Sequence, residues 1–168
     1  SEPYQYQYEI KEYGKPVAYL MIKNSGYVPY PQAIAARPDV IKKKRACFKQ
    51  LVPLIQKAQV DYITRPGPVN RKLVNIVTDL NTFWRETVAG NAFNAAQQRK
   101  LGLVQNGPDC TLGNFRLNRV QQTINLLLPI YRDKGSKTFK EDLRATDIVT
   151  NEFIDPKIGL PKEGCPKH

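Results

Sequence analysis

Two short runs of this 168-residue chain have the length and apolar character of β-strands, at residues 17–22 and 32–36. Neither run is flanked by a tight hairpin turn, so each is expected to join a sheet that is built with strands from elsewhere. The residues before position 17 do not supply such strands. We therefore expect the chain to start in mid-structure and to form part of an α/β domain, rich in helix and poor in strand.

Helical spacing of apolar residues marks most of the remaining chain. It predicts a helix from Pro38 to about residue 62, a second one between the turn at 65–68 and residue 80, and a third over 82–101 that stops at Gly102. A fourth helix is expected to start from an Asn114 cap and to end near residue 133.

Two prolines fall inside these predicted helices. Pro53 and Pro129 are expected to bend them, because proline lacks an amide donor and clashes with the preceding turn. Shorter helical turns are predicted within 3–13 and at 146–147, and the segment 151–160 is expected to be irregular and packed by its apolar side chains.

The composition is that of a soluble globular chain of one domain, with 41% apolar and 24% charged residues. Its net charge of +11 raises the possibility of nucleic-acid binding. The densest basic run is KKKR at 42–45, and four successive helical residues point around most of the helix, so they do not form one binding face. We interpret the run as a solvated helix end, and we expect no nucleic-acid partner.

The three cysteines, Cys47, Cys110 and Cys165, have neither zinc-site nor redox-motif spacing. In an exported protein, one disulfide among the three would leave one thiol over. Cys47 lies at a helix position that is predicted to be buried, and we expect it to be free. The single histidine, His168, is terminal and cannot complete a metal site, so no metal and no cofactor are expected.

No nucleophile with a positioned base and no oriented carboxylate pair stands out, so the chain is not expected to be an enzyme. Binding has better support, because seven of the nine tyrosines fall in the first thirty residues. Tyr27 and Tyr30 flank a proline-containing loop from which side chains can reach a cleft. For Tyr30, packing against the protein is an equally good interpretation, and for Tyr6 and Tyr13 packing is the preferred one.

Three segments together resemble the C-terminal half of a bacterial ABC-transporter substrate-binding protein. They read LVPLIQKAQVDYI (51–63), LGLVQNGPDCTLGNF (101–115) and DIVTNEFIDPKIGLP (147–161). The group that the chain resembles includes the nitrate, sulfonate and taurine binders and the binders of thiamine-pyrimidine precursors. The resemblance implies a two-lobed periplasmic-binding-protein type II fold, with an N-terminal half preceding this chain.

Within that architecture, residues 1–36 would end one lobe and form the return crossover. Residues 37–161 would supply the helical part of the other lobe, and 162–168 a tail. The resemblance implies an extracytoplasmic component of an ABC importer, which binds a small polar solute and delivers it to a membrane permease. An anion and an aminopyrimidine-like compound are the candidate solutes. The alternative of a different class is a basic module that binds nucleic acid or an acidic partner through 42–45.

The resemblance also implies ligand-binding residues. A Glu-Pro pair follows a strand at the cleft in such proteins, and here it is Glu2-Pro3, followed by Tyr4. Its carboxylate would accept hydrogen bonds from the solute. Residues 81–84 (NTFW) carry part of the likeness, and for Trp84 a core role is slightly preferred over stacking on the ligand. With Tyr27 and Tyr30, the expected ligand-binding set is therefore Glu2, Tyr4, Tyr27, Tyr30 and Trp84.

Overall fold

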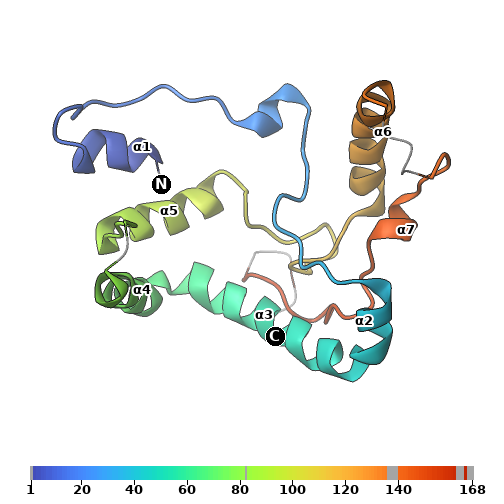
Figure 1. Cartoon of the computed structure of the whole chain (residues 1–168). Helices are drawn as coiled ribbons and strands as arrows, with labels where there is room; N and C mark the ends of the chain where they lie inside the picture. Colours follow the sequence, from blue (N-terminus) through green and yellow to red (C-terminus); the bar gives the residue numbers. More distant parts are fainter. Residues whose placement is uncertain (1, 82, 136–139, 162–164, 166–168) are drawn as a thin grey trace. The chain divides into compact units, whose positions relative to one another are not determined.

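The computed structural model describes residues 2–81, 83–135, 140–161 and 165 (Figure 1). Its helical content is 56%, and the described residues contain no β-strand. The α-helices are α1 (Glu2–Tyr4), α2 (Pro38–Lys43), α3 (Arg45–Thr64), α4 (Pro66–Leu80), α5 (Val88–Lys100), α6 (Leu117–Asp133) and α7 (Ala145–Ile148). A π-helical turn, η1 (Gln5–Glu9), follows α1, and a 3-10 turn, η2 (Ile22–Ser25), precedes a left-handed Gly26.

The prediction of a helix-rich chain is confirmed, and the two predicted strands are wrong. Residues 17–22 end in the η2 turn, and residues 32–36 form no regular element. A strand is stable only where a neighbouring strand pairs with its backbone groups, and the described part of the chain offers none. The side chains of Leu20 and Ile22 are 95% and 69% exposed, so their apolar character does not mark a buried strand.

Two helices start later in the chain than the sequence predicts. The predicted helix at 82 begins instead at Val88, where the hydroxyl of Thr87 caps it by accepting the Gly90 N–H at 3.0 Å. The predicted cap at Asn114 is also wrong, because α6 begins at Leu117. The Asn151 side chain accepts the Phe115 N–H at 2.7 Å and donates to the Phe115 carbonyl at 2.8 Å. These two hydrogen bonds keep Phe115 out of the helix.

The chain forms two compact units. Unit 1 consists of Ser1–Tyr19, Leu54–Leu112 and Pro156–His168, and unit 2 of Leu20–Pro53 and Gly113–Asp155. The boundary falls inside α3 at Pro53, which lies within that helix as predicted. The lobe boundaries at 36 and 161 that the family resemblance implies stay a prediction.

Unit 1 has a small apolar core that includes Ile63 and Ala95, each 2% exposed. Helix α4 packs against α5 (Figure 1). The fully buried Asn70 on α4 accepts a hydrogen bond from the hydroxyl of Tyr62 on α3, which ties these two helices together. Burial, with a smaller contribution from the charge of Glu86, raises the pKa of the Tyr62 hydroxyl.

A disulfide joins Cys110 to Cys165 in unit 1. Cys47 is free, as predicted, but it is exposed rather than buried. It lies in the first turn of α3, where the neighbouring Ala46 and Lys49 are exposed as well. The prediction from helical spacing therefore assigned Cys47 to the wrong side of α3. The next residue, Phe48, is the one that packs inward, against Phe153, with 5.5 Å between the ring centroids.

Unit 2 is built around Val120 and Ile124 on α6 and Ala145 at the start of α7. The Gln121 side chain joins these helices by accepting the Ala145 N–H at 2.9 Å. The carboxylate of Asp147 accepts the Arg144 N–H at 2.9 Å, and this hydrogen bond holds the pKa of Asp147 below its usual value. The irregular segment after α7 is confirmed, and Phe153 is buried within it.

Among the described residues, no helix combines the length and the hydropathy that a membrane span requires.

Candidate functional site

In unit 1, Tyr4 lies in an aromatic cluster on the surface of α5. Its ring centroid is 4.9 Å from that of Tyr8 and 5.3 Å from that of Phe93. Glu9 accepts a hydrogen bond from the Thr87 hydroxyl, which fastens η1 to the start of α5. Gly90 makes this approach possible, since a Cβ there would lie 2.9 Å from Thr87 Oγ1 and 3.6 Å from Tyr4 Cδ1.

The other two predicted ligand-binding residues of unit 1 are more exposed. Glu2 is an exposed residue of α1, two residues before Tyr4 of the aromatic cluster. Trp84 is 63% exposed and lies on Phe83, with 4.9 Å between the ring centroids. The core interpretation of Trp84 is therefore wrong, and Phe83 and Trp84 form an exposed pair of aromatic rings on this part of the surface.

In unit 2, Tyr30 makes contacts on three sides with the start of α6. Its hydroxyl accepts the Arg116 N–H at 3.0 Å, and its ring meets Phe115 edge to face at 5.0 Å. The Arg119 guanidinium lies over the same ring, 4.0 Å from the centroid, and donates to the carbonyls of Val28 and Pro29. These contacts favour the packing interpretation of Tyr30. Its neighbour Tyr27 is half-buried.

Replacing Tyr30 by Phe tests the packing interpretation. The Arg116 N–H would lose its acceptor, and we expect the free energy of unfolding to fall by about 1 kcal/mol, as for a typical hydrogen bond. The Tyr27→Phe variant is the matched control, for which we expect a smaller change. Urea unfolding of both variants gives the comparison. Equal stabilities of the Tyr30→Phe and wild-type proteins would show that the hydrogen bond to this hydroxyl does not stabilise the fold.

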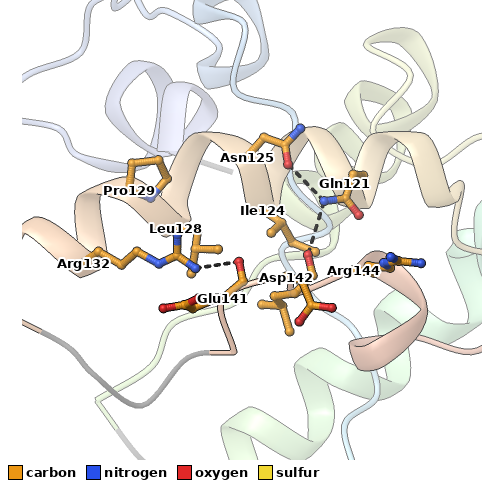
Figure 2. Close-up of a pocket in the computed structure, with 10 residues that line it drawn as sticks. Gln121, Ile124, Asn125, Leu128, Pro129, Arg132, Glu141, Asp142 and Arg144 are labelled. Atoms are coloured by element: carbon orange, nitrogen blue, oxygen red, sulfur yellow. Dashed lines mark hydrogen bonds between the residues drawn. The ribbon is translucent and has the colours of Figure 1, made fainter.

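Unit 2 has an open groove of about 650 Å³ between α6 and the segment 141–144 (Figure 2). Ile124, Leu128 and Leu143 supply its apolar lining. Its polar lining comes from Gln121, Asn125, Arg132, Glu141, Asp142 and Arg144. A mixed lining of this kind suits a small polar molecule, because the apolar part excludes water and the polar groups orient the ligand.

Several polar groups of the groove are already engaged within unit 2. The Arg132 guanidinium donates to the carbonyl of Glu141 at 2.7 Å (Figure 2). Gln121 donates to Asn125 Oδ1 at 3.0 Å. The first bond links α6 to the segment 141–144, and the second joins two side chains along α6. The sequence prediction did not identify the groove, and the only signal was the pair of amides Gln121 and Asn125, spaced by one helical turn at the edge of the apolar face.

The groove lining contains no histidine or cysteine. Across the residues that the structure describes, no group of three or more His, Cys, Asp or Glu side chains is arranged to hold a metal ion. The groove lining therefore offers amide, carboxylate and guanidinium groups.

The basic run at 42–45 is divided between two helices. Lys42 and Lys43 end α2, and Arg45 begins α3, where it pairs with Glu152 at 2.7 Å. The three lysines are exposed. One of the four charges is therefore already paired within unit 2, which weakens the case for this run as a single anionic-partner site.

In comparisons with family models, with curated proteins and with solved structures, the chain matched none of them.

Proposed function

We propose that the chain is part of an extracytoplasmic solute-binding component of an ABC importer and that it binds a small polar solute rather than catalysing a reaction. The observation that supports the proposal most is that the segments carrying the family resemblance contact one another. Within unit 1, Gln56 Nε2 donates to the Leu112 carbonyl at 2.8 Å, and the Leu112 N–H donates to the Ile158 carbonyl at 2.9 Å. All three segments therefore meet at Leu112.

Further buried polar contacts reinforce this meeting point. The hydroxyl of Thr111, which is 1% exposed, donates to the carbonyl of Pro156 at 3.2 Å. Asn106 pairs with both backbone groups of Leu160, donating to the carbonyl at 2.8 Å and accepting the N–H at 2.7 Å. Buried polar side chains need such specific partners. The three segments that carry the resemblance are therefore held together by hydrogen bonds within unit 1.

For the solute, the proposal retains Glu2, Tyr4, Tyr27, Tyr30 and Trp84 as ligand-binding residues. Glu2 and Trp84 suit this role best, because an exposed carboxylate and an exposed indole can accept hydrogen bonds from a ligand and stack on it. The net charge of +11 would attract an anionic solute at long range. A membrane permease is the proposed partner of the solute-loaded protein. The disulfide suits an extracytoplasmic location, where thiols are oxidised.

A thermal-shift screen tests the proposal. The panel consists of nitrate, taurine and an aminopyrimidine, and a binding solute is expected to stabilise the protein by about 2.7 kcal/mol at a hundredfold excess over its Kd. We expect the Trp84→Ala variant to lose this gain. The matched control is Tyr19→Ala, which removes another exposed aromatic side chain, 52% exposed in unit 1, outside the proposed set.

The same samples separate this function from the basic-module alternative. A solute gain that Trp84→Ala removes and Tyr19→Ala retains supports solute binding. Binding of an oligonucleotide that weakens steeply with salt, with no response to any solute, would instead support a basic module acting through 42–45.

A further inference from the structure

Helix α4 carries an apolar stripe on its exposed side. Val69, Leu73, Ile76 and Leu80 follow one another at intervals of four, three and four residues. Their side chains are 41%, 41%, 42% and 66% exposed, so each of them keeps a large apolar area in water. The inward side of the helix is formed by Asn70, Val74 and Val77, which are buried or half-buried. The four exposed residues, which we call the α4 stripe, lie beside this inward side of the helix.

The spacing of the α4 stripe is that of alternating a and d positions of a heptad repeat. If Val69 occupies position d, Leu73, Ile76 and Leu80 occupy a, d and a. This spacing reads the same in both chain directions. A second α4 helix that runs antiparallel would therefore place its Leu80 against Val69 and its Ile76 against Leu73. Each of these two pairs forms one layer of the interface, and the two-fold axis between the copies would generate the same two layers again.

The charges beside the α4 stripe select the antiparallel arrangement. Lys72 and Asp79 both occupy position g in this frame, on the side of the stripe away from the buried Asn70. Both are exposed, and neither forms an ion pair within the described part of the chain. In an antiparallel pair, g positions face g positions, so Lys72 of each copy meets Asp79 of the other. In a parallel pair, Lys72 would face Val77, which offers no charge.

We propose that the α4 stripe is a self-association surface, on which a second copy of this chain docks its own α4 in antiparallel orientation. The spacing of the apolar residues and the pairing of Lys72 with Asp79 both favour a second copy of the chain as the partner. The surface is short, with two layers that the symmetry repeats, and it falls below the area of a permanent dimer. The expected complex is accordingly a weak, concentration-dependent dimer that is independent of solute binding.

Sedimentation velocity over a concentration series from about 5 to about 500 μM, a range that suits weak interfaces, tests the proposal with charge-reversal variants. Asp79→Lys sets like charges against each other at both symmetric positions, and we expect the dimer to weaken by about tenfold. Lys72→Asp is expected to weaken it similarly. The double variant Lys72→Asp/Asp79→Lys restores both pairs and is expected to recover wild-type dimerisation.

Two controls accompany these variants. Arg71→Asp makes the same change of charge as Lys72→Asp, but at position f, away from the α4 stripe, and is expected to leave dimerisation unchanged. Leu73→Glu is expected to give a monomer at every concentration, with helical content checked by circular dichroism. A wild-type protein that is monomeric throughout the series would overturn the proposal. Single reversals without effect, or a double variant that fails to recover, would overturn it equally.

Discussion

Removing the disulfide between Cys110 and Cys165 is expected to lower the free energy of unfolding by about 4 kcal/mol, as chain entropy predicts for a closed loop of this size. The two cysteines are separated by 55 residues, so the bridge removes many conformations from the unfolded chain. The bridge also lies close in sequence to Asn106 and Thr111, whose side chains bond to Leu160 and Pro156 of the C-terminal segment. Losing the bridge would therefore loosen the meeting point of the three resemblance segments.

Urea unfolding measures this effect. The variants Cys110→Ser and Cys165→Ser, and the wild-type protein under a reductant, are expected to lose stability by similar amounts. Cys47→Ser is the matched control, because Cys47 is free and exposed, and its unfolding midpoint should stay at the wild-type value. If reduction leaves the wild-type midpoint unchanged, the bridge has no structural role in solution.

Gly159→Ala is expected to destabilise the protein by about 3 kcal/mol, at the upper end of the range for overpacking. A Cβ at this position would overlap the carbonyl oxygen of Cys110 and would lie 3.1 and 3.3 Å from the amide atoms of Asn106. Neither neighbour can move easily. The disulfide and the hydrogen bond to Gly107 hold Cys110 in place, and the paired hydrogen bonds to Leu160 hold Asn106.

Gly67→Ala is the matched control for this substitution. Gly67 lies in the first turn of α4, and the nearest atom to a Cβ there is Arg71 Nη1, at an ordinary contact distance of 3.7 Å. Alanine also favours the helix over glycine, so we expect this variant to be as stable as the wild type or more so. Equal stabilities of Gly159→Ala and Gly67→Ala in urea would contradict the close packing of Gly159 on Cys110.

Helices were predicted well where their signals are local. The break between α3 and α4 was predicted, but it is Arg65 alone rather than a turn over 65–68, because Pro66 and Gly67 already belong to α4. The short helix at Ala145–Ile148 appears where the sequence indicated it. Helix starts that depend on distant residues were not predictable. No local pattern shows that Asn151 holds Phe115, or that the Tyr30 hydroxyl accepts the Arg116 N–H. The predicted strands failed for the same reason, because a strand depends on partners that its own sequence does not reveal.

The candidate sites show the same limit. Trp84 was identified from the resemblance, but its exposure is a tertiary property that helical spacing could not give. The pairing of Cys110 with Cys165 does not follow from their spacing, since three cysteines allow three different single disulfides. The groove beside α6 depends on the return of residues 141–144 to that helix. By contrast, the helical spacing of the α4 stripe follows from the sequence, whereas the exposure of its side chains is known only from the structure.

Native mass spectrometry of the protein with the solute panel tests the central claim, solute binding, most directly. The account predicts a native mass increased by one solute molecule, which disappears on denaturation and in the Trp84→Ala variant but not in Tyr19→Ala. A native mass without any such addition across the panel, together with salt-sensitive binding of an oligonucleotide, would contradict the solute-binding proposal.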